Sequence, residues 1–144
     1  MKRIFLMQLS DGSEINPVSK RRVMEVMSKL HPDAFQSGDN YMILREKTGT
    51  RASLEWTHFN GHGFYMILRR GVDAHSPMTA RPIASRSSTA WIRCRYRHDT
   101  LNISPEVMLT GEEMLRVLRH FLERAARSTV MNWVDIKDSR AEAE

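Results

Sequence analysis

The chain has 144 residues, of which 41% are hydrophobic and 27% charged, a composition typical of one soluble globular domain. No stretch approaches the roughly 18 consecutive apolar residues of a membrane span, and the apolar run after Lys2 and Arg3 is too short for a secretory signal, so we expect a cytoplasmic protein. The single cysteine, Cys94, excludes an internal disulfide and an all-cysteine metal site.

The formal net charge of +5 originates in the middle of the chain. Residues 65–100 contain seven basic and two acidic side chains, and all seven basic residues are arginines. Such a concentration is typical either of a solvated sheet face or of a docking surface for an acidic partner, whether protein or nucleic acid.

The first half of the chain predicts one strand, one helix and a run of further strands. The stretch "KRIFLMQL" has the apolar density of a strand, and residues 17–30 show helical apolar spacing, with Asn16 as N-cap and Pro17 in the first helical position. Three strand-like stretches follow, "NYMILREK", "ASLEWTHF" and "GFYMILRR". Residues 71–82 are rich in turn-forming residues and predict a loop.

Residues 88–97, "STAWIRCRYR", show the alternation of a half-buried strand. One face carries Ala90, Ile92, Cys94 and Tyr96, and the opposite face carries Trp91, Arg93, Arg95 and Arg97. We expect Cys94 to be a buried and inert thiol, because alternation places its arginine neighbours on the other face.

The last third predicts a helix and a short strand. Thr110 and Glu113 have the spacing of a capping box, and residues 111–126 carry a continuous apolar stripe. The stretch "VMNWVDI" predicts a strand, and residues 137–144 predict a polar C-terminal tail with no reason to order. Strands in a run between two helices predict the α+β class: a single domain, 1–136, with an antiparallel sheet packed against two main helices at about 17–30 and 111–126.

The stretch "WTHFNGHG" raises the question of a catalytic or metal site, because His58 and His62 stand four residues apart. Asn60 and Gly61 are the preferred central pair of a type I′ hairpin, with Phe59 facing His62. That register places the two histidines on opposite faces, which disfavours a shared metal ion. No glycine-rich phosphate-binding loop and no convergent set of catalytic residues is found either, so the sequence predicts no enzyme, no cofactor and no small-molecule substrate.

A longer pattern adds a family resemblance. The hairpin "ASLEWTHFNGHGFYMILRRG" precedes a polar loop, and "LNISPEVMLTGEEMLRVLRHFLERAARSTVMNWVDI" combines an amphipathic helix, Phe121, a short break and Trp133. This pattern resembles the immunity proteins of bacterial polymorphic toxin systems, in particular the deaminase-immunity family (the Imm-one family). The resemblance covers most of the chain in outline and is specific over residues 103–136. The chain departs from the family in having no glycine or proline in "RAARSTVMNW", and in being basic where many immunity proteins are acidic.

The resemblance implies a non-enzymatic inhibitor used in interbacterial competition, for example against type VI secretion effectors. Such a protein binds one cognate toxin, such as a deaminase or another secreted effector, in a heterodimer and blocks its active site. Phe121 and Trp133 would then be core residues that identify the family without marking the interface.

The interface has to be predicted from the residues themselves. Tryptophan and arginine are the residues most enriched in binding hot spots, and the toxin-binding prediction is Trp91, Arg93, Arg95, Arg97, Arg69 and Arg70. Asn60 and His62 at the hairpin tip are a weaker contact prediction. The alternative is a small basic nucleic-acid-binding or regulatory module that uses the same face, although Trp91 is the only aromatic residue clearly on it.

Overall fold

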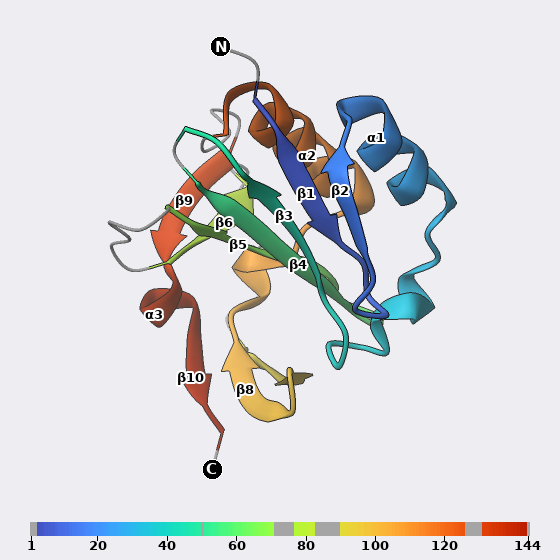
Figure 1. The fold of residues 1–144 in the computed structure, drawn as a ribbon. Coiled ribbons are helices and arrows are strands. Elements are labelled where there is room, and N and C mark those ends of the chain that lie inside the picture. The colour runs from blue at the N-terminus through green and yellow to red at the C-terminus, as the bar shows by residue number, and fades with distance from the viewer. Residues whose placement is uncertain (1–2, 50, 71–76, 83–89, 126–130, 144) are drawn as a thin grey trace.

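The computed structural model describes residues 3–49, 51–70, 77–82, 90–125 and 131–143. Within these residues the strands form two antiparallel sheets, which confirms the α+β class (Figure 1). The seven-stranded sheet has the order β2-β1-β3-β4-β5-β6-β9, with bounds β1 Phe5–Gln8, β2 Glu14–Val18, β3 Met42–Glu46, β4 Ser53–Phe59, β5 Gly63–Arg69, β6 Met78–Pro82 and β9 Met131–Asp135. The three-stranded sheet has the order β10-β8-β7, with bounds β7 Ile92–Tyr96, β8 Asp99–Ile103 and β10 Arg140–Glu142.

Helices and short 3₁₀ turns connect these strands. Their bounds are α1 Lys20–Lys29, η1 Pro32–Phe35, η2 Pro105–Val107, α2 Gly111–Arg124 and α3 Ile136–Ser139. The two longer helices, α1 and α2, lie together beside β1 and β2 (Figure 1).

The large sheet separates two hydrophobic cores, because successive side chains of β4 and β5 point to opposite faces. Leu54, Trp56, Met66 and Leu68 pack with α1 and α2 on one face. Phe59, Tyr65 and Ile67 pack with Cys94, Tyr96, Leu101 and Ile103 of the small sheet on the other face. The result is a three-layer arrangement of helices, large sheet and small sheet, where the sequence predicts one sheet packed on helices.

Helix α1 begins three residues later than the sequence predicts. Pro17 lies in β2, and the N-cap is Ser19, whose hydroxyl accepts a hydrogen bond from the backbone N–H of Arg22 at 3.1 Å. The prediction of Asn16 as N-cap and Pro17 as first helical residue is therefore wrong. A serine hydroxyl is an equally good cap, and strand pairing of β2 with β1 claims the residues before it.

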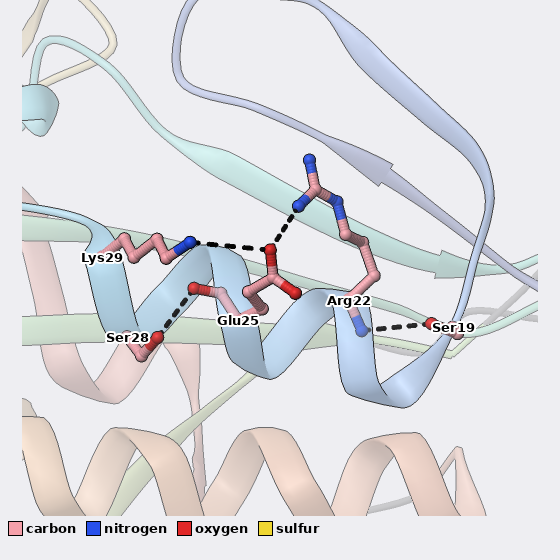
Figure 2. A network of polar contacts seen from close by, with 5 residues as sticks. All are labelled: Ser19, Arg22, Glu25, Ser28 and Lys29. Carbon is pink, nitrogen blue, oxygen red and sulfur yellow. Dashed lines mark hydrogen bonds and ion pairs between the residues drawn. The ribbon is translucent and has the colours of Figure 1, made fainter.

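An exposed network then supports the helix (Figure 2). The carboxylate of Glu25 forms ion pairs with Arg22 at 2.7 Å and with Lys29 at 3.7 Å. The hydroxyl of Ser28 donates to the backbone carbonyl of Glu25 at 2.8 Å. Each exposed pair of this kind adds a few tenths of a kcal/mol to helix stability, roughly 0.3–0.5 kcal/mol.

Helix α2 follows the sequence prediction closely. The hydroxyl of Thr110 accepts from the backbone N–H of Glu113, and the Glu113 carboxylate accepts from the backbone N–H of Thr110, which confirms the capping box. The helix ends at Arg124, before the expected residue 126, which lies outside the described residues. Phe121 is fully buried and Trp133 is partly buried against the same core.

Two segments that read as irregular are strands. Within the predicted loop 71–82, residues Met78–Pro82 form β6 between β5 and β9, while residues 71–76 lie outside the described part of the chain. Thr79 and Pro82 break the apolar pattern expected of a buried strand. The Thr79 hydroxyl donates to the Met66 carbonyl, and Pro82 is the last residue of the strand, where its missing N–H affects only the end of the ladder.

The second correction concerns the C-terminal segment. The prediction that residues 137–144 form an unordered tail is wrong for the residues described, because they continue α3 and form β10, which pairs with β8. Ser139 is buried, and Ala141 pairs with Asn102 across the ladder. This segment is ordered by hydrogen bonds between backbones, and such bonds require no apolar pattern that the sequence could show.

Candidate functional site

Strand β7 carries the surface that the sequence singles out. Cys94 and Tyr96 are buried, whereas Arg93 and Arg95 are exposed, which confirms the predicted alternation. Ala90, expected on the apolar face, is exposed because it lies ahead of the strand. Trp91 also precedes the strand, and 46% of its surface is exposed, far more than is usual for a large aromatic residue.

The loop before β3 fixes the exposed side of this strand. The backbone N–H of Arg97 donates to the carbonyl of Gly38 at 3.1 Å, and the guanidinium Nε of Arg95 lies 3.2 Å from Asp39 Oδ1. Gly38 has φ +96°, and a Cβ there would collide with the carbonyl oxygen of Arg95 and the ring of Phe59. Only glycine therefore allows this close approach between loop and strand.

The hairpin between β4 and β5 exists, but its register differs from the prediction. Phe59 pairs with Gly63 and not with His62, so the loop has three residues, Asn60 to His62, and the two-residue type I′ turn is wrong. Of the Asn60–Gly61 pair, only Gly61 has a positive φ, +79°. Gly63 has φ +132°, and its neighbour Phe64 exchanges two backbone hydrogen bonds with Leu109, at 2.8 and 2.7 Å.

The two histidines of this hairpin have different environments. The ring of His58 packs against Phe64 with centroids 4.7 Å apart, and burial lowers the pKa of His58. His62 is exposed at the tip. Across the described residues, no group of three or more histidine, cysteine, aspartate or glutamate side chains is placed to hold a metal ion.

The hairpin tip and β7 meet at one groove. Asn60, His62, Arg93 and Arg95 line it together with Ser37 and Asp39, and its volume is about 340 Å³. The backbone N–H of Asn60 donates to the Ser37 hydroxyl at 3.1 Å, which ties the tip to the same loop that holds Arg95. We call Trp91, Arg93, Arg95, Asn60 and His62 the β7 surface. The structure thus brings Arg93 and Arg95 together with the two predicted contact residues of the hairpin tip.

The remaining predicted arginines lie elsewhere. Arg97 stands in the turn after β7, with its guanidinium carbon 4.2 Å from the ring centroid of Tyr41 and Nη1 3.4 Å from Glu55 Oε1. Arg69 ends β5 and lines a second pocket together with Arg97. Arg70 is exposed beyond the strand. The six-residue prediction therefore divides into two locations.

Sequence reasoning missed the buried polar contact beneath this region. The Tyr96 hydroxyl donates to the Glu55 carboxylate, and both residues are buried. Burial raises the pKa of Tyr96, and the negative charge of Glu55 raises it further. Glu55 alternates with Leu54 and Trp56, so the pattern predicts an exposed side chain. The small sheet, which covers that face, has no signal in the β4 sequence.

The Cys94 thiol is buried as expected. Burial raises its pKa from 9.0 to about 11, so the thiol stays protonated near neutral pH.

None of the helices described is long and apolar enough to cross a membrane. No protein-family model, curated protein or solved structure matches this chain.

Proposed function

We propose that this protein is a cytoplasmic, non-enzymatic immunity protein that binds a cognate bacterial toxin in a heterodimer and blocks its active site. The observation that carries the proposal is Trp91, which is 46% exposed just ahead of β7, the strand whose outward-facing residues are Arg93 and Arg95. A solvent-exposed tryptophan and two exposed arginines within five residues have the composition of a protein-binding hot spot. The resemblance to the deaminase-immunity family supplies the kind of partner.

The geometry of the β7 surface suits recognition of a folded protein. Arg95 is held by Asp39, and the loop that carries Asp39 is anchored by Gly38. A side chain that is already ordered loses less conformational entropy on binding than a mobile one. The groove between Arg93 and the hairpin tip offers a concave site on the same side of the small sheet as Arg95.

The nucleic-acid alternative is supported less well. Arg95 and Arg97 form ion pairs with Asp39 and Glu55, which reduces the positive charge they can offer to phosphates. Binding of single strands also uses several stacking platforms, and Trp91 is the one aromatic residue among the described residues that is strongly exposed.

The experiment is co-expression with the product of the gene directly upstream, where a toxin is expected. We expect the wild-type chain to restore growth of cells that express this product and to co-purify with it. Neither rescue nor a complex would contradict the immunity proposal. Binding of single-stranded DNA or RNA at physiological salt, measured by fluorescence anisotropy, would favour the alternative instead.

A charge-reversal pair tests the interface itself. Arg93→Glu with Arg95→Glu should weaken toxin binding about 100-fold or more, because it places two negative charges on the surface and leaves Asp39 without its arginine partner. The matched control is Arg21→Glu with Arg119→Glu, which makes the same charge change at exposed positions of α1 and α2, across the large sheet. Equal affinity of the two double variants would remove the β7 surface from the interface.

A further inference from the structure

A second pocket lies where the small sheet meets the end of β5. Its volume is about 580 Å³, within the range of small-molecule sites. Four cationic side chains line it, each from a different part of the fold: Arg69 at the end of β5, Arg97 after β7, Lys137 in α3 and Arg140 in β10. These residues lie as far apart in sequence as 69 and 140, so only the folded chain brings them together.

The cationic side chains of this pocket outnumber the carboxylates near them in the part of the chain described, and because Arg97 is already paired with Glu55 the excess rests on the other three. Asp99 and Glu142 are the two acidic residues that line it, and both are exposed. Arg69 and Arg140 are only partly exposed, yet neither forms an ion pair with another described residue. A partly buried guanidinium without a counter-charge loses hydration that an anion would replace.

The floor of the pocket strengthens this effect. Tyr96, Leu101 and Ile136 line it and are buried, so the charges face apolar surface on one side. Electrostatic attraction is stronger beside such surface than in open water. Arg140 also acts on Tyr65 of the large sheet. Burial raises the pKa of Tyr65, and the positive charge of Arg140 opposes that rise.

We propose that this pocket binds the phosphate groups of a small phosphorylated molecule. Guanidinium groups match phosphate oxygens with paired hydrogen bonds, and Lys137 adds an exposed ammonium group. A volume of about 580 Å³ suits a compact ligand, and the exposed carboxylates of Asp99 and Glu142, which also line the pocket, oppose binding of any anion. This proposal goes beyond the immunity function, because binding at this pocket requires no partner protein.

Isothermal titration calorimetry of the wild-type chain tests the proposal directly. The probes are inorganic phosphate, pyrophosphate and adenosine triphosphate, each titrated at an ionic strength held constant with chloride. We expect saturable one-to-one binding, with pyrophosphate tighter than phosphate. Pyrophosphate binding as tightly as the nucleotide would identify phosphate recognition alone, and a tighter nucleotide would add contacts to the base or ribose. No saturable binding of any probe at millimolar concentration would overturn the proposal.

Single substitutions locate the binding site. Arg69→Gln and Arg140→Gln should each weaken binding about tenfold, because each removes charge-assisted hydrogen bonds to the anion. Lys137 is exposed, so Lys137→Gln provides a variant that leaves the packing intact. Arg119→Gln, at an exposed position of α2 across the large sheet, is the matched control and should bind like the wild type. Wild-type affinity in all three pocket variants would place the anion elsewhere and reject this site.

Discussion

The hydroxyl of Tyr96 in the small sheet donates a hydrogen bond to the carboxylate of Glu55 in the large sheet, and only 4% and 3% of these residues are exposed. The same carboxylate lies 3.4 Å from Arg97. One buried acidic group therefore joins the two sheets and also orients a cation at the surface. Its removal would leave a buried donor and an arginine without their acceptor.

The first prediction follows from this contact. Tyr96→Phe should lower the free energy of unfolding by about 2 kcal/mol, because it leaves a buried carboxylate oxygen without its donor. The measurement is urea denaturation followed by circular dichroism. Tyr41→Phe is the matched control, since the Tyr41 hydroxyl accepts from Arg97 at 3.3 Å at a partly exposed position and should cost less than about 1 kcal/mol. Equal costs would mean that the Tyr96–Glu55 contact adds nothing to stability.

The second prediction concerns the loop that holds Arg95. Gly38→Ala should destabilise the fold by about 2–4 kcal/mol, because it combines an unfavourable positive φ with a collision against the Arg95 carbonyl. Gly12→Ala is the comparison, since Gly12 has φ +88° but no atom within 4 Å of the added Cβ. That control should lose only about 1–2 kcal/mol. Thermal unfolding of the two variants separates backbone strain from the collision, and identical losses would exclude the close approach.

The third prediction concerns the pH dependence of Cys94. Its pKa is raised to about 11 by burial, so the reactive thiolate is scarce in the native protein until the pH approaches 11. Because the neutral thiol is favoured only in the folded state, this contribution to stability is complete below pH 9 and is lost as the pH rises toward 11. Iodoacetamide labelling of Cys94 at pH 8 should be slow in buffer and fast in about 8 M urea, because urea at that concentration unfolds the chain and exposes the thiol. Equal rates would show an accessible thiol.

The fourth prediction concerns β10. Deleting residues 140–144 should lower the free energy of unfolding by about 1–3 kcal/mol, because the backbone pairing of β10 with β8 contributes roughly 0.5–1.5 kcal/mol for each hydrogen bond. Chemical denaturation of the shortened chain measures this loss. An unchanged midpoint would mean that the segment does not contribute to the fold. The same deletion removes Arg140 and should also weaken anion binding.

Apolar periodicity predicts the parts of this fold that bury a regular stripe. The α2 stripe, the capping box of Thr110 and Glu113, and the alternation around Cys94 all match the structure. Each of these depends on residues that are close in sequence, so the local pattern contains the information that determines it. The fold class follows from the order of such elements.

The missed features depend on contacts between distant residues. The bridge between Phe64 and Leu109 joins residues 45 positions apart, and β10 is ordered by pairing with β8. Glu55 is buried by a sheet whose strands follow 37 or more positions later. Folding also brings Arg93 into one groove with the hairpin tip, and Arg69 into one pocket with Arg140, although each pair is distant in sequence. None of these contacts leaves a signal within a short stretch of sequence.

The burial of β5 on both faces also bears on how the chain can diverge. A substitution at Tyr65 or Met66 disturbs one of two cores, so inherited change in this strand is strongly constrained. The outward side chains of β7, Arg93 and Arg95, belong to neither core. Under the proposed function, changes of recognition specificity at the edge of the small sheet would leave the packing of both cores intact.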